Sequence, residues 1–261
     1  MNRTGTKSSL HELESGFDHE LALLRAGQRR IIKMEFSHPS RVALAESLGY
    51  VCLPATGHYG IGSESPDIVY GTGECTTVFV GTADDARYAL HLEQQERGPD
   101  PDERLQAMRE LGVLLGYPAC CTEAYEKQRT QDESASFARL LGGADRVEGH
   151  YANNLFVLDH QVISHFPCDL KCPVSQEVGL HALRLYRKDA PVAADALIEL
   201  LKSPVQVWDR FRIRVNHPSR GILFANNISK EPRVHAHPTL TKFLDRLPLL
   251  PDGGTWVHWI P

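Results

Sequence analysis

Four cysteines in two short motifs are the residues of this sequence best suited to chemistry. The first motif, Gly-Tyr-Pro-Ala-Cys-Cys, ends in the adjacent residues Cys120 and Cys121. The second, His-Phe-Pro-Cys-Asp-Leu-Lys-Cys, contains Cys168 and Cys172. Each motif lies at a predicted helix start, where unpaired backbone N–H groups and the positive end of the helix dipole stabilise thiolates. We therefore expect the four thiolates to hold a metal centre.

The spacing of these cysteines favours an iron–sulfur cluster over a single zinc ion. The separation of Cys168 and Cys172 suits either kind of centre. Side chains of adjacent helical residues project about 100° apart, which makes it awkward for Cys120 and Cys121 to bind one small tetrahedral ion. A four-iron cluster is wider and offers separate iron atoms to the thiolates. The prediction is a 4Fe–4S cluster, with zinc as the alternative.

Two resemblances accompany this pattern. A tandem Cys-Cys, followed later by a Cys and by Cys172-Pro173, resembles the ligand pattern in cluster-bearing small subunits of nickel–iron hydrogenases and respiratory complex I, over these few residues alone. Segments 116–121 and 165–172 resemble an uncharacterised archaeal and bacterial family with Gly-Tyr-Pro-x-Cys-Cys and His-x-Pro-Cys-x-x-x-Cys motifs, over roughly residues 105–188. That family is a domain of unknown function, so the resemblance implies that the two motifs belong together and implies no reaction.

Two polar residues beside the cysteines are candidates for catalysis. If only three thiolates bind a cluster, one iron stays open, and His165 could serve as its fourth ligand or as a proton donor. Glu123 lies in the first turn of a predicted helix, where an acidic side chain is also a common partner of the dipole. The expected chemistry is redox or sulfur transfer, by an oxidoreductase or a sulfur transferase. Its partners would be a small-molecule substrate or a redox partner protein.

Other functions stay open on the sequence alone. A structural zinc or cluster could tie the helices together in a protein that serves as a binding module. A metal-free enzyme could use Cys120 or Cys121 as its nucleophile. The four cysteines could also be packing residues with no metal. The substrate, the reaction and the oligomeric state do not follow from the sequence.

Several residues are weaker candidates. Five polar side chains near the motifs could line a pocket: Tyr125, His150, Asn153, Asn154 and His160. The two asparagines could equally cap a predicted helix over 155–163. Four histidines lie in the C-terminal part: His217, His235, His237 and His258. On a strand, His235 and His237 would lie on the same face and could coordinate one metal ion together.

Glycine-rich stretches and two further cysteines receive structural interpretations. Segments 57–62 and 71–73 complete no nucleotide-binding fingerprint and are interpreted as turns. Cys52 and Cys75 have no partner at a ligand spacing, so we expect them to pack in the core.

Composition and charge narrow the class of protein. The chain has 261 residues, of which 42% are hydrophobic and 23% charged, as in an ordinary globular protein. Its 28 basic and 33 acidic residues are spread along the chain, so no nucleic-acid partner is expected. No apolar run suits a signal peptide or a membrane span, which predicts a cytoplasmic protein without a membrane partner. In that reducing compartment clustered cysteines favour metal binding over disulfides.

The elements that must position the cysteines form a mixed α+β fold. We expect a disordered tail over 1–9, an α/β N-terminal subdomain over 10–98, and a mainly helical, cysteine-bearing subdomain over 103–261 with a few late strands. Apolar periodicity and caps predict helices over 10–28, 41–48, 82–96 and 105–117, from 118 onward, and over 173–188 and 191–202. Strands are predicted over 30–36, 67–70, 76–80, 211–215, 221–224 and 255–260.

Overall fold

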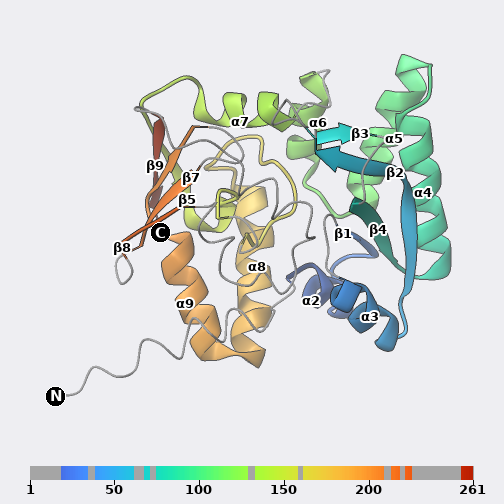
Figure 1. The fold of residues 1–261 in the computed structure, drawn as a ribbon, viewed down its shortest axis with the longest axis horizontal. Coiled ribbons are helices and arrows are strands. Elements are labelled where there is room, and N and C mark those ends of the chain that lie inside the picture. The colour runs from blue at the N-terminus through green and yellow to red at the C-terminus, as the bar shows by residue number, and fades with distance from the viewer. Residues whose placement is uncertain are drawn as a thin grey trace. The chain divides into compact units, whose positions relative to one another are not determined.

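The computed structural model describes residues 19–34, 39–61, 68–70, 75–128, 133–157, 161–208, 213–217, 221–224 and 254–260. Within these residues the chain is a mixed α+β protein with a four-stranded and a five-stranded sheet (Figure 1). This confirms the predicted fold class: a small N-terminal sheet with flanking helices, then helices and late strands. The chain divides into two compact units, one formed mainly by 23–126 and one by 127–224 and 254–260 with 19–22.

The first unit is built on an antiparallel sheet with strand order β1-β4-β2-β3. Its strands are β1 (Ile31–Met34), β2 (Val51–Ile61), β3 (Ile68–Tyr70) and β4 (Cys75–Gly81). Strands β1, β3 and β4 confirm predicted strands, with ends that differ by a few residues.

Strand β2 is the element of this sheet that sequence reasoning missed. Proline and glycine are disfavoured inside strands, and this segment contains Pro54, Gly57 and Gly60. The register of β2 against β4 shifts between Pro54 and His58, which is the irregularity that lets such a segment stay in a sheet. The interpretation of 57–62 as turns is therefore wrong as far as Ile61, where the strand ends.

Helices cover this sheet and continue to the tandem cysteines. They are α3 (Pro39–Ser47), α4 (Ala83–Glu96), α5 (Pro101–Leu114) and α6 (Ala119–Lys127). Asp100 caps α5 by accepting the N–H of Asp102 at 2.8 Å and of Glu103 at 3.2 Å. One apolar cluster joins strand residues to both long helices: Ile31, Ala55, Phe79, Ala86, Ala89, Leu92, Ala107, Leu111, Leu114 and Leu115.

The predicted subdomain boundary near residue 98 lies between α4 and α5, two helices of the same apolar cluster. Whether 10–98 and 103–261 fold separately stays a prediction. The predicted tail over 1–9 lies outside the described residues, as does most of the helix predicted over 10–28. The described part of that helix is α2 (His19–Arg25).

The second unit contains a sheet with strand order β5-β9-β6-β7-β8. Strand β5 pairs with β9 in parallel, and the remaining pairs are antiparallel. The strands are β5 (Arg146–His150), β6 (Val205–Val207), β7 (Ile213–His217), β8 (Gly221–Phe224) and β9 (Thr255–Ile260). The three late strands were predicted, whereas the short strands β5 and β6 were not.

Helices of the second unit carry or support the second cysteine motif. They are α7 (Glu133–Leu141), the 3₁₀ turn η1 (Tyr151–Asn153), α8 (Pro173–Asp189) and α9 (Pro191–Leu201). Helices α8 and α9 confirm predictions, and α7 was not predicted. The helix predicted over 155–163 is wrong, because the described residues 154–157 and 161–163 contain no helix. No helix in the described part of the chain has both the length and the apolar character needed to cross a membrane.

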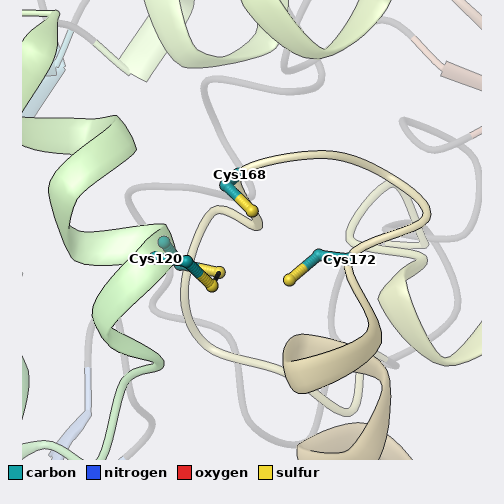
Figure 2. Close-up of side chains that lie close together, drawn as sticks. Cys120, Cys168 and Cys172 are labelled. Atoms are coloured by element: carbon teal, nitrogen blue, oxygen red, sulfur yellow. Dashed lines mark hydrogen bonds between the residues drawn. The ribbon is translucent and has the colours of Figure 1, made fainter.

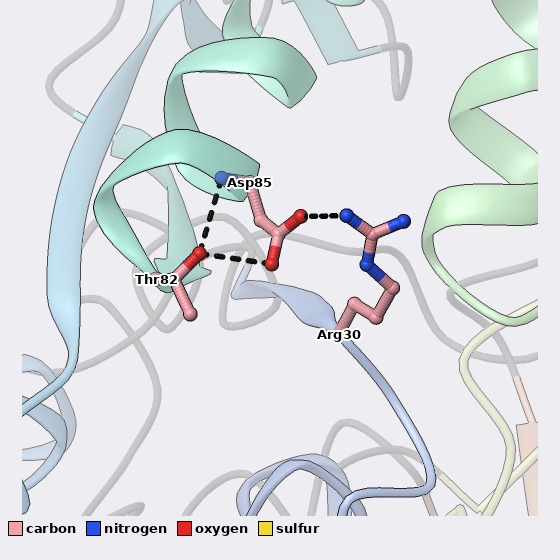
Figure 3. A network of polar contacts seen from close by, with 3 residues as sticks. All are labelled: Arg30, Thr82 and Asp85. Carbon is pink, nitrogen blue, oxygen red and sulfur yellow. Dashed lines mark hydrogen bonds and ion pairs between the residues drawn. The ribbon is translucent and has the colours of Figure 1, made fainter.

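The start of α4 yields a test of this fold. Thr82 is the N-cap residue, and its hydroxyl accepts the N–H of Asp85 at 3.2 Å and donates to the Asp85 carboxylate at 2.9 Å (Figure 3). Arg30, beside β1, pairs with the same carboxylate. Thr82→Ala should lower the free energy of unfolding by about 1 kcal/mol, measured by urea denaturation. Thr82→Ser keeps the hydroxyl, so its free energy of unfolding should be close to that of the parent protein. An equal decrease in this free energy in both variants would contradict the capping role.

Candidate metal centre

The tandem cysteines occupy the first turn of α6. Helix α5 ends at Leu114, and Gly116 follows with a φ of 72°, a left-handed conformation that favours glycine. The carbonyl oxygen of Pro118 then accepts the N–H of Cys121 at 2.9 Å and that of Thr122 at 3.0 Å. The turn between α5 and α6 therefore fixes the backbone on which Cys120 and Cys121 lie.

The second pair lies on the loop that leads into α8. Cys172 is the N-cap residue of α8, and its Sγ accepts the N–H of Ser175 at 3.5 Å. Pro173 occupies the first turn, where its missing N–H costs no helical hydrogen bond. The N–H of Cys172 donates to the carbonyl of Asp169 at 2.9 Å, which closes a turn between Cys168 and Cys172.

The four sulfur atoms converge. The Sγ atoms of Cys120, Cys121, Cys168 and Cys172 all lie within 4.8 Å of one another. Figure 2 shows the sulfur atoms of Cys120, Cys168 and Cys172 directed toward the same small region. Cys121 and Cys172 are buried, whereas Cys120 and Cys168 are at least partly exposed. Among the described residues, no other group of three or more His, Cys, Asp or Glu side chains brings its ligand atoms together in this way. The four cysteines therefore lie close enough together to be compatible with the predicted metal centre.

The distances also test the argument raised against a single ion. A tetrahedral site with metal–sulfur bonds of about 2.3 Å has sulfur–sulfur edges of about 3.8 Å. The Sγ atoms of Cys120 and Cys121 are 3.9 Å apart. Rotation about the Cα–Cβ bonds thus brings adjacent cysteines close enough to share one ion, although their Cα–Cβ bonds diverge. The donor set, four thiol sulfurs, suits zinc and iron alike.

His165 is linked by hydrogen bonds to Cys172, the N-cap residue of α8, through Ser175. Its side chain is 7% exposed, and its Nε2 lies 2.9 Å from the hydroxyl of Ser175. Ser175 in turn donates its backbone N–H to Cys172 Sγ. His165 is therefore connected to a cysteine sulfur through one intervening residue. Its predicted catalytic role stays a prediction.

Glu123 is exposed on α6, three positions beyond Cys120. Arg109 of α5 binds Glu126 of α6, and this hydrogen bond together with the charges of Glu126 and Glu123 raises the pKa of the Arg109 guanidinium. Glu123 thus contributes to the charge balance between two helices. Its predicted catalytic role is likewise untested.

The weaker candidates have other partners or lie outside the described residues. His150 is buried and its Nδ1 accepts the N–H of Ala152 at 3.1 Å; burial and the charge of Lys202 lower its pKa. Asn154 donates to the carbonyl of Leu201 at 2.8 Å. His217 and His258 belong to β7 and β9, and Tyr125 to α6. The remaining candidates fall outside the described part of the chain: His160, His235, His237 and the stretch 71–73.

Two residues that sequence reasoning did not select hold the Cys168–Cys172 loop, one through its side chain and one through its backbone N–H. Arg139 of α7 donates to the carbonyl oxygens of Cys168 and Pro167, the latter at 2.8 Å. The backbone N–H of Ser175 donates to Cys172 Sγ, as described above. Arg139 lies in a helix that was not predicted and 29 positions from Cys168, so no local motif could have identified it. Ser175 could have been found, because the position three residues after an N-cap ordinarily donates to it.

Comparisons with protein-family models, with curated proteins and with solved structures find no match to this chain. The likeness of the two motifs to the archaeal and bacterial family therefore stays a resemblance. Function must be argued from the four cysteines and their surroundings.

Cys52 provides a test of the distinction between packing and ligating cysteines. Burial and the nearby charge of Glu46 raise the pKa of Cys52 from 9.0 to about 11. At pH 8 this shift reduces its thiolate fraction about 100-fold relative to the unfolded chain, so iodoacetamide should label it about 100-fold more slowly in the folded protein. The rate should rise about tenfold per pH unit up to about pH 11. Peptide mass spectrometry measures the labelling rate of Cys52 in the folded and in the unfolded protein. Equal rates in the two states would contradict the raised pKa.

Proposed function

We propose that this chain is a metal–thiolate protein in which Cys120, Cys121, Cys168 and Cys172 bind one tetrahedral metal ion, zinc, as a structural centre. The observation that carries the proposal is the approach of four Sγ atoms to within 4.8 Å of one another. Thiolates on four side chains complete the coordination that structural zinc sites use. Such an ion would connect the two cysteine motifs, and the free energy of its binding would contribute to the stability of the folded chain.

The sulfur spacing supports a single ion over a cluster. In a four-iron cluster each thiolate binds a different iron at a separate corner, so the thiolates lie farther apart than around one ion. The separation of 3.9 Å between the sulfurs of Cys120 and Cys121 matches the edge of a single-ion tetrahedron, about 3.8 Å. Four protein ligands also leave no open position for a substrate, which supports a structural role over catalysis. The chain would then serve as a binding module.

A second candidate is a 4Fe–4S cluster with redox or sulfur-transfer chemistry. It is supported by the positions of Cys120, Cys121 and Cys172 at the starts of α6 and α8, where helix dipoles favour an anionic cluster. The partial exposure of Cys120 and Cys168 would leave one side of the cluster open to a small-molecule substrate or a redox partner protein. The cluster would supply electron transfer or a Lewis-acidic iron; His165 and Glu123 remain the candidate proton carriers for it.

Metal analysis after anaerobic purification separates the two candidates. The proposal predicts a colourless protein with one zinc per chain and no acid-labile sulfide, and loss of the zinc when Cys172 is replaced by Ser. A brown protein with about four iron and four sulfide per chain would establish the second candidate. A folded protein that binds neither metal tightly would reject both.

Unfolding measurements test whether the metal stabilises the fold. Free zinc at about 1,000 times its Kd stabilises a folded protein by about 4 kcal/mol. Cys172→Ser should therefore lose about this much of the free energy of unfolding in zinc buffer and little more when a chelator is added. Cys52→Ser is the matched control, because Cys52 is half-buried and lies outside the centre; zinc should stabilise this variant as it does the parent. Equal zinc dependence in both variants would contradict the assignment of Cys172 as a ligand.

A further inference from the structure

The loop from Cys168 to Cys172 is held at both ends by side chains that are not ligands. At its second end, Asn153 is fully buried, and its Nδ2 donates to the carbonyl oxygens of Leu170 and Cys172, each at 3.1 Å. The backbone N–H of His150, at the end of β5, donates to the same Leu170 carbonyl at 2.9 Å. One side-chain amide thus fixes the backbone of a cysteine and of the residue two positions before it.

Asn153 is itself fixed by close packing of η1 on α8. A Cβ added to Gly179 of α8 would lie 2.5 Å from the carbonyl oxygen of Ala152, so only glycine permits this approach. Because Ala152 precedes Asn153 in η1, the contact sets the distance between the asparagine and the start of α8, where Cys172 is the cap. The position of the amide is therefore determined by backbone packing and not by the loop alone.

At the first end of the loop, Arg139 donates from both terminal nitrogens to the carbonyls of Pro167 and Cys168. The guanidinium is planar and presents its N–H donors in a rigid fork, so it holds two neighbouring carbonyls in one orientation. The Arg139 guanidinium also places a positive charge next to Cys168, one of the proposed thiolate ligands. A centre with four thiolates and one divalent ion keeps a net negative charge, which this cation offsets.

We propose that Asn153 and Arg139 are positioning residues that hold Cys168 and Cys172 in their metal-binding arrangement, so that this loop is a preformed half of the site. The inference rests on the proposed metal centre. Partners outside the ligand set that orient ligands change metal affinity by about 10- to 100-fold when they are removed. The hydrogen bonds of both residues run to the protein backbone, so they do not need the metal in order to form.

Cobalt(II) titration of the reduced, metal-free full chain tests this inference, because tetrahedral cobalt bound to thiolates has visible bands that report its geometry. Asn153→Asp replaces the donating amide by a carboxylate that faces two carbonyl oxygens. It should weaken cobalt binding about 10- to 100-fold, and zinc binding by a similar factor in competition, with altered bands. Asn154→Asp is the matched control: this neighbour is equally buried, and its amide donates to Leu201 at the end of α9. It should leave cobalt affinity and bands unchanged.

Arg139 supplies a second variant in case Asn153→Asp does not fold. Arg139→Gln should weaken cobalt binding, and Arg139→Lys, which keeps the charge and one donor group, should recover part of the affinity. The control is Arg187→Gln, because Arg187 is exposed and pairs with Asp195 of α9. Parent-like affinity in Asn153→Asp or Arg139→Gln, or equal losses in the controls, would overturn the inference. Failure of the parent chain to bind cobalt through thiolates would instead overturn the proposed function.

Discussion

The proposed function depends on one physical constraint, the presence of four sulfur atoms within 4.8 Å of one another. As thiolates they would repel one another, since two like charges 4 Å apart interact by about 4 kcal/mol at an effective dielectric constant of 20. A divalent ion reverses the sign of that interaction, and its binding removes the thiol protons. A bound metal would therefore stabilise an arrangement of side chains that is otherwise unfavourable.

The backbone around the cysteines is organised before any ion is considered. Gly116 and the carbonyl of Pro118 set the turn that begins α6, and the packing of Gly179 on Ala152 sets the start of α8. Hydrogen bonds between protein groups at each cysteine pair thus restrict the chain, which lowers the conformational entropy that metal binding must overcome. Cys120 is exposed, so among the proposed ligands it is the one that a metal ion in solution or a chelator would reach most easily.

Local sequence signals predicted the parts of this fold and site that local interactions determine. Thr82 and Pro173 mark the starts of α4 and α8, and the cysteine motifs identified the four side chains whose sulfur atoms converge. The missed elements depend on distant partners: β2 keeps Pro54 in a strand through a register shift against β4, and short β6 is stabilised by pairing with β7 and β9. The prediction of a cluster was based on ideal helical directions, which do not fix where the side-chain sulfurs lie: those of Cys120 and Cys121 are 3.9 Å apart.

X-ray absorption spectroscopy on the purified, metal-loaded chain tests the central claim most directly, because it identifies the metal and its neighbours together. A single zinc ion bound by the four cysteines would give a zinc edge with four sulfur neighbours at about 2.3 Å and no metal–metal scattering. An iron edge with iron–iron scattering, or a zinc edge dominated by nitrogen and oxygen neighbours, would contradict it.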